Sequence, residues 1–289
     1  MDALFDKLNE VVLEWAQNLI TFGYGVFNDF ANHAMQLLAM SPESWSPSGW
    51  SLITSLNTIF VVVAAQLVVV FFLIGFCAES LDPKQELRFE TILRMFIKLS
   101  VAEFFVVNTL PIVQSFFSLV GALAGSVAGE ADILTGIPDD VRQIMENPDD
   151  MGGMTFVAFL LGVVFMLIMM ISGVLIVYQA YIRFFKIMLL IPYGTLANST
   201  LAGNHTLVQS AVSFWKFALS SILEAVTMMI ALRLAAMILT SAEGTVNFLT
   251  ASNNGEYLCI WMIQSAMIVL VCVGSVKGAS MITQRALGL

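Results

Sequence analysis

The chain has 289 residues, of which 58% are hydrophobic and only 11% are charged, whereas an ordinary soluble domain is about 25% charged. A soluble globular protein is excluded, because a domain of this length needs many more polar residues to cover its surface. The composition predicts an all-α polytopic membrane protein. The formal net charge is −9, and no basic face large enough to follow a phosphate backbone is visible outside the membrane.

Residues 1–50 are predicted to form an extracytoplasmic amphipathic helix and a hinge. Apolar residues recur at spacings of three and four: Leu4, Leu8, Val11, Trp15, Leu19, Phe22, Val26 and Phe30. Acidic residues lie off this stripe, and we expect a break near 23–25. A helix that lies on lipid usually carries Lys and Arg, so the acidic face favours a protein partner or self-association. Within the hinge at 41–50, two tryptophans either anchor the chain at the outer membrane surface or are incidental.

Residues 51–289 are predicted to form a transmembrane domain of five helices. A hydrocarbon core needs about 20 apolar residues, and five segments meet this length: 52–76, 95–123, 154–182, 217–240 and 257–276. Cytoplasmic connections retain Lys and Arg, and most of the 12 cations follow the first, third and fifth spans. The distribution predicts an outside N-terminus and an inside C-terminus.

The connection at 124–153 is predicted to lie outside and to be acidic. It contains seven acids and Arg142, which gives seven minus one, a formal charge of −6. Pro138, the acids after it and the Asn-Pro pair at 147–148 predict a short helix between them. This helix is either a docking element or a solvated connector.

Ionisable residues inside spans are candidate functional residues, because each costs about 2.5 to 3.5 kcal/mol at a helix centre. Two explanations remain open for the glutamates: they line a polar path, or they are structural residues that lock helices together. The candidates for either role are Glu103, Asn108, Gln114, Gln179, Glu224 and Arg233. The sequence contains no metal-ligand spacing, phosphate loop or nucleophile motif, so we expect neither catalysis nor a cofactor.

An apolar piece follows the third span and ends in Pro-Tyr-Gly. Arg183 and Lys186 precede it, and Pro192 with Gly194 breaks the predicted helix. We expect an elbow along the cytoplasmic face that leads to Trp215 and Lys216 before the fourth span. Glycines with spacings of four predict bare helix faces for helix–helix contact: Gly121, Gly125, Gly129, Gly274 and Gly278.

In this layout the chain resembles the TrbL-type polytopic inner-membrane subunit of conjugative type IV secretion systems. The resemblance rests on the outside helical region before five spans, on the Arg-x-x-Lys, apolar and Pro-x-Gly element at 183–194, on Trp215-Lys216, and on the segments 274–279 and 286–289. It implies a non-enzymatic channel or platform subunit that assists the passage of single-stranded DNA with its attached relaxase.

The resemblance also implies partners. They are the lipid bilayer, further copies of the chain as a homo-oligomer, other type IV secretion subunits including ATPases, and the DNA and relaxase only transiently. The alternative function is a small-solute or ion transporter. The inner cations at 183, 186 and 216 either contact a phosphate backbone or only fix the topology.

Overall fold

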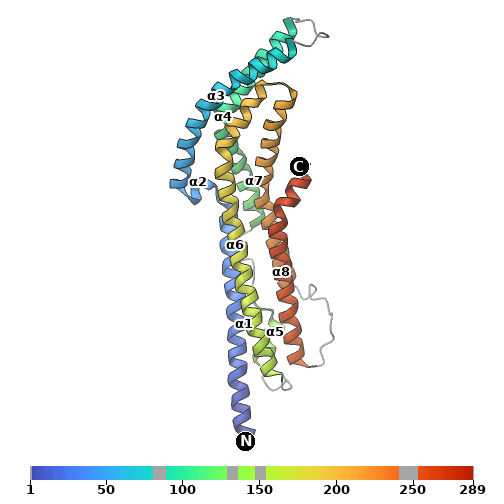
Figure 1. Ribbon diagram of the computed structural model, residues 1–289. Helices are drawn as coiled ribbons and strands as arrows, with labels where there is room; N and C mark the ends of the chain where they lie inside the picture. Colours follow the sequence, from blue (N-terminus) through green and yellow to red (C-terminus); the bar gives the residue numbers. More distant parts are fainter. Residues whose placement is uncertain (1, 81–88, 129–135, 147–153, 241–252, 289) are drawn as a thin grey trace. The chain divides into compact units, whose positions relative to one another are not determined.

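The computed structural model describes residues 2–80, 89–128, 136–146, 154–240 and 253–288. These residues form helices without any strand in the described ranges (Figure 1). In chain order the helices are α1 (Asp2–Ala39), α2 (Pro42–Trp45), α3 (Pro47–Ser80), α4 (Phe89–Ala128), α5 (Asp139–Glu146), α6 (Thr155–Ser199), the 3-10 helix η2 (Thr200–Ala202), α7 (His205–Thr240) and α8 (Asn254–Ala286). The all-α prediction is confirmed.

Five of these helices are long and apolar enough to cross a membrane. They are α3, α4, α6 with η2, α7 and α8, and each corresponds to one predicted span. α3, α4 and α8 extend beyond both predicted ends. α6 extends only beyond residue 182, and α7 extends only before residue 217. The orientation relative to the membrane stays a prediction.

The helices form two compact units. The first contains Met1–Leu38, Val127–Ala180 and Thr227–Ala279, and the second contains Ala39–Ser126, Tyr181–Val226 and Ser280–Leu289. The predicted division at residue 50 concerns position relative to the membrane, and it remains a prediction.

In the first unit α1 packs in parallel beside the first half of α6 (Figure 1). A Cβ at Gly23 would lie 2.9 Å from the Cα of Met166, and one at Gly173 would lie 2.9 Å from the Cβ of Phe30. Both contacts join residue i of α1 to residue i+143 of α6, so the register is constant over two helical turns. The missing side chains of these glycines let the two backbones approach closely.

The side of α1 that is buried differs from the apolar stripe predicted from the sequence. The buried side chains are Leu13, Ala16, Ile20, Tyr24, Phe27 and Ala31, whereas Trp15 and Phe22 of the predicted stripe are each 56% exposed. The helix therefore has two adjacent apolar faces and buries the one that carries the smaller residues. The expected break near residue 23 is absent as well, since α1 continues from Asp2 to Ala39.

The second unit surrounds two apolar clusters. One joins Trp50 of α3, Val113 and Phe117 of α4, Ile187 of α6 and Ile222 of α7. The other joins α3 and α4 to η2 and contains Ala64, Val68, Ala102, Val106 and Ala202. The first half of α7 and the second half of α6 therefore share a core with the α3–α4 pair.

The hinge tryptophans are core residues of this unit. The ring of Trp45 stacks on Phe184, with centroids 4.7 Å apart and planes 2° apart, and Trp50 is 7% exposed. Ser41 caps α2 by accepting a hydrogen bond from the backbone N–H of Ser44 at 3.2 Å. The stretch is thus a short capped helix held against α6. Its tryptophans are not incidental, and their position at the outer membrane surface stays a prediction.

The predicted elbow at Pro192 is also wrong in its position. α6 continues through Pro192 and Gly194 to Ser199, and the chain turns only at Gly203–Asn204. Proline removes one backbone donor and so leaves the carbonyl four residues earlier without its helical partner, a defect that apolar helices tolerate where neighbouring groups pack around it. In the next turn the Thr195 hydroxyl donates to the carbonyl of Pro192 at 2.7 Å. A side chain at Gly194 would collide with the ring of Phe214, so Gly194 serves helix packing.

The predicted outer helix at 139–146 is present as α5. Its Val141 and Met145 are buried, with 1% and 7% exposure, and Gln17 of α1 donates a hydrogen bond to the Met145 carbonyl. α5 therefore packs on α1 within the first unit, and a role as a docking element stays a prediction. Residues 129–135 and 147–153 of the acidic connection, which include Gly129, lie outside the described residues, as do Lys84 and Arg88.

Candidate functional site

The second unit contains an ion pair between α6 and α7. Arg183 and Lys186 lie three residues apart, so they share one face of α6. The Lys186 Nζ is 3.0 Å from the Glu224 Oε2, and the two side chains are 25% and 9% exposed. Arg183 is 2% exposed and also interacts electrostatically with Glu224. We call these three residues the ionic centre, in which two cations of one helix share one acid of the next.

Aromatic rings line the ionic centre. The guanidinium of Arg183 lies 5.6 Å from the ring centroid of Phe184, and the Lys186 ammonium lies 5.1 Å from that of Phe217. Cations at this distance from a ring face are attracted by its quadrupole, by about 0.5–2 kcal/mol depending on desolvation. The centre is therefore a largely desolvated contact that fixes α6 against α7.

A second polar contact, the amide centre, joins α4, α6 and α7. Trp215 Nε1 donates to Asn198 Oδ1 at 2.8 Å, and Asn198 Nδ2 donates to Thr109 Oγ1 at 2.9 Å. The Thr109 hydroxyl in turn donates to the Phe105 carbonyl at 2.6 Å. Asn198 and Thr109 are fully buried, with 0% exposure. A buried amide that uses both its donor and its acceptor ties three helices in one arrangement.

The ring of Trp215 is held by edge-on contacts with three phenylalanines. The centroids of Phe105, Phe116 and Phe214 lie 5.9, 6.1 and 5.3 Å away. Such pairs contribute about 0.5–1.5 kcal/mol beyond area burial. Trp215 thus serves helix packing and hydrogen bonding together, and Lys216 beside it is exposed, with Nζ 3.4 Å from the Gly288 carbonyl.

The other candidates of the second unit do not join the ionic centre. Glu103 is exposed on α4, and the Asn108 amide donates to the Phe104 carbonyl of its own helix at 2.8 Å. Gln114 donates to Glu43 at 3.5 Å. Among the described residues, no hydrogen bond or ion pair links Glu103, Asn108 or Gln114 to Glu224.

Gln179 and Arg233 belong to the first unit, where both are half-buried. The described contacts of the second unit therefore give Glu224 a helix-locking partner and give no polar path to it. This geometry fits the second of the two explanations for that glutamate.

The described glycines of these faces meet few neighbours among the described residues of other elements. A Cβ at Gly125, Gly274 or Gly278 would meet no atom within 4 Å, and one at Gly121 would meet only the Ala39 carbonyl at 3.9 Å. Their role in helix–helix contact between copies stays a prediction.

Sequence reasoning missed Asn198 and Thr109. Asn198 stands in an Asn-Ser-Thr triplet that resembles a glycosylation site, and Thr109 follows Asn108 within an apolar run. The one available signal is the cost of burying an amide without a partner, which predicts a partner for Asn198 without naming it.

A comparison with family models decides the family. The model described as TrbL/VirB6 plasmid conjugal transfer like protein matches residues 27–195, which is more than half of the chain. The chain belongs to the TrbL/VirB6 conjugal transfer family. The matched range includes Thr109, Arg183 and Lys186, while Glu224 and Trp215 lie beyond it. No curated protein and no solved structure matches the chain.

Membership in this family, together with the five apolar helices, makes the chain a multi-pass inner-membrane protein of a conjugal transfer family. The suspected TrbL-type resemblance is confirmed.

Proposed function

We propose that the chain is a channel or platform subunit of a conjugative type IV secretion system, which assists the translocation of single-stranded DNA with its attached relaxase across the cell membrane. The family match over residues 27–195 carries this proposal. The proposed role is non-enzymatic, and separate ATPases of the same system supply the energy.

A platform subunit must keep its helices in one arrangement while other subunits work on it. The ionic centre and the amide centre supply such contacts, because they connect α4, α6 and α7 through desolvated charges and buried amides. Buried polar contacts of this kind favour one helix register over others. We therefore assign these residues a positioning role, with Arg183 and Lys186 as helix contacts.

We further propose that the chain acts as a homo-oligomer. Gly274 and Gly278 lie on α8, where an added Cβ would meet no atom of another described element within 4 Å, and small residues permit close helix approach in lipid. The test is the mass of the complex in mild detergent. We expect an oligomer for the wild type and a loss of mass for Gly274→Leu, with Ser275→Leu on the same turn as control.

The test of the transfer role is deletion of the gene from its conjugative element. We expect transfer of the element to be lost and to return when the gene is supplied in trans, while uptake of small solutes by the same cells stays unchanged. A solute transporter gives the opposite pair of results: altered uptake and unchanged transfer.

A further inference from the structure

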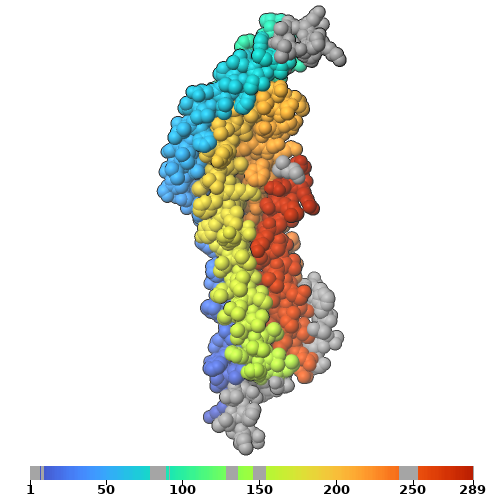
Figure 2. Space-filling view, in the orientation of Figure 1, coloured from blue at the N-terminus to red at the C-terminus, as the bar shows by residue number. Residues whose placement is uncertain are grey.

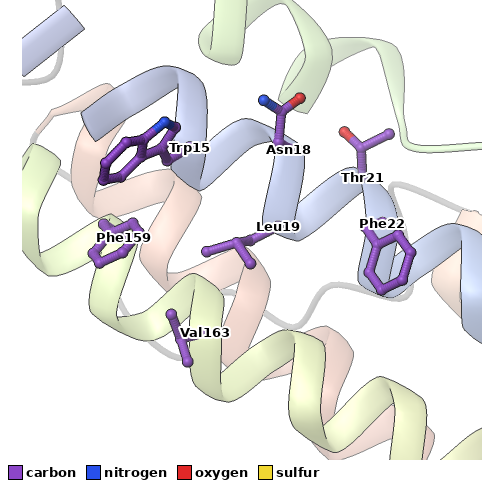
Figure 3. Close-up of a pocket in the computed structure, with 7 residues that line it drawn as sticks. All are labelled: Trp15, Asn18, Leu19, Thr21, Phe22, Phe159 and Val163. Atoms are coloured by element: carbon purple, nitrogen blue, oxygen red, sulfur yellow. The ribbon is translucent and has the colours of Figure 1, made fainter. Parts of the chain in front are cut away.

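The first unit has an open groove between α1 and α6. Trp15, Leu19 and Phe22 of α1 form one wall, and Phe159 and Val163 of α6 form the other (Figure 3). The groove has a volume of about 750 Å³. Figure 3 shows Asn18 and Thr21 at its rim, directed away from α6. The lining is therefore apolar, and its polar groups lie at the edge.

The groove continues an apolar surface of a membrane-spanning helix. On α6 the neighbours of Val163 on the same side are Phe156, Leu160 and Leu167, which are 68%, 60% and 41% exposed. Figure 2 shows the first half of α6, in yellow-green, open on the visible face. Exposed residues of this kind on a span face hydrocarbon. The groove thus opens onto a lipid-facing surface.

Polarity changes along α1 in the direction expected for one leaflet. Glu10 and Glu14 are exposed before the groove, and Trp15 lies at its first end, where membrane proteins enrich tryptophan. After Glu14 the next charged residue is Asp29. Asp29 lies 14 residues beyond Trp15, which is about 21 Å along the helix axis. One leaflet contributes about 15 Å of hydrocarbon, so a charge-free stretch of α1 covers its depth.

The position on α6 agrees with this depth. Val163 follows the first helical residue, Thr155, by eight residues, about 12 Å along the axis. On the opposite side of α1, Gln17 bonds α5, whose Asp139, Asp140 and Arg142 are exposed. This end of the first unit is therefore the polar end, and the groove leads from it into the bilayer.

We propose that the groove between α1 and α6 binds the acyl chain of a bilayer phospholipid, in the leaflet that covers the first turns of α6. The headgroup lies at the level of Glu14 and Trp15, and the chain extends past Leu19 toward Phe22 and Val163. Glu10 and Glu14, two of the acidic residues that favoured a protein partner, lie off this face, at or before the headgroup level. The proposal places residues 15–22 of α1 within this leaflet, which replaces the extracytoplasmic position predicted for them from the sequence. It depends on membrane insertion of α1 and α6 and not on DNA transfer.

The test is photocrosslinking of the full chain in vesicles of phosphatidylethanolamine and phosphatidylglycerol that contain a radiolabelled phosphatidylethanolamine. The crosslinker replaces Phe22 (Phe22→p-benzoylphenylalanine). Phe22 is exposed, so this replacement does not disturb the packing of the core. Leu160 is the reference for contact with bulk lipid, and Glu10 is the reference outside the groove. We expect a lipid adduct at Phe22 comparable to that at Leu160 and well above that at Glu10.

A pair of filling variants distinguishes the groove from a general lipid surface. In the Phe22 crosslinker background, Val163→Trp fills the groove, whereas Val164→Trp adds the same ring at a side chain that is 47% exposed and is not part of its lining. We expect most of the lipid adduct to be lost with Val163→Trp and retained with Val164→Trp. Equal adducts in the two variants, a dimer-sized protein adduct in place of lipid, or no lipid adduct at Phe22 would each overturn the proposal.

Discussion

The replacement Glu224→Gln removes the acid of the ionic centre and leaves its two cations in place. Lys186 then loses its partner at 3.0 Å, and the buried Arg183 loses an attractive charge. The glutamine keeps the size of the side chain, so packing between α6 and α7 changes little. Any loss of stability therefore measures the cost of leaving the two cations without a compensating negative charge.

The size of the effect follows from burial. Removing one partner of a buried ion pair costs about 3–5 kcal/mol, whereas exposed pairs contribute about 0–1 kcal/mol. Glu224 is 9% exposed and Lys186 is 25% exposed, so water reaches the ammonium in part. We expect a loss of about 3 kcal/mol, near the lower end for buried pairs. At about 2–4 °C per kcal/mol for large domains, the Tm falls by about 6–12 °C.

The assay is thermal unfolding of the purified protein in mild detergent. Glu103→Gln makes the same chemical change at an exposed glutamate of α4 and serves as the matched control. The exchanged variant Lys186→Glu/Glu224→Lys restores an opposite pair between the helices, so its Tm should lie above those of both single variants. The ionic centre does not lock α6 to α7 if Glu224→Gln has the same Tm as Glu103→Gln. The same conclusion follows if the Tm of the exchanged variant is no higher than those of the single variants.

Three further changes test the packing of the two units. Asn198→Ala leaves the Trp215 N–H without its acceptor and should cost about 1–3 kcal/mol in chemical unfolding, whereas the exposed Asn18→Ala should change stability by less than about 0.5 kcal/mol. Gly194→Ala pushes a methyl group into the ring of Phe214 and should cost about 1–3 kcal/mol, partly recovered by Phe214→Leu; an unchanged Tm contradicts the contact. Tyr24→Phe removes a buried hydroxyl without a hydrogen-bond partner among the described residues, so the Tm should stay equal or rise, and a clear fall would reveal a partner.

Helix identity could be read from the sequence because long apolar runs and helix-start signals are local. The predictions of the five spans and of the helix at 139–146 use only signals from residues that are neighbours in the sequence. The face of α1 could not be read in the same way. Its two apolar stripes have the same periodicity, so periodicity does not show which one is buried. The buried stripe contains Ala16 and Ala31, whose small side chains let another helix approach closely and add little hydrophobicity.

The polar centres show a second limit of local reasoning. Lys186 and Glu224 are 38 residues apart, and their pairing depends on how α6 and α7 rotate about their axes, which spacing along one helix does not reveal. Pro192 shows the converse case. A local rule predicts a helix break there, but α6 continues to Ser199 and packs against Phe214 of α7 at Gly194.

The most direct test of the transfer role is the frequency of DNA transfer from donors that lack the gene and receive it in trans. We expect the wild type and the exchanged variant Lys186→Glu/Glu224→Lys to restore transfer, Glu224→Gln to restore it poorly, and the empty vector to restore none. Transfer from empty-vector donors at the wild-type frequency would contradict the account.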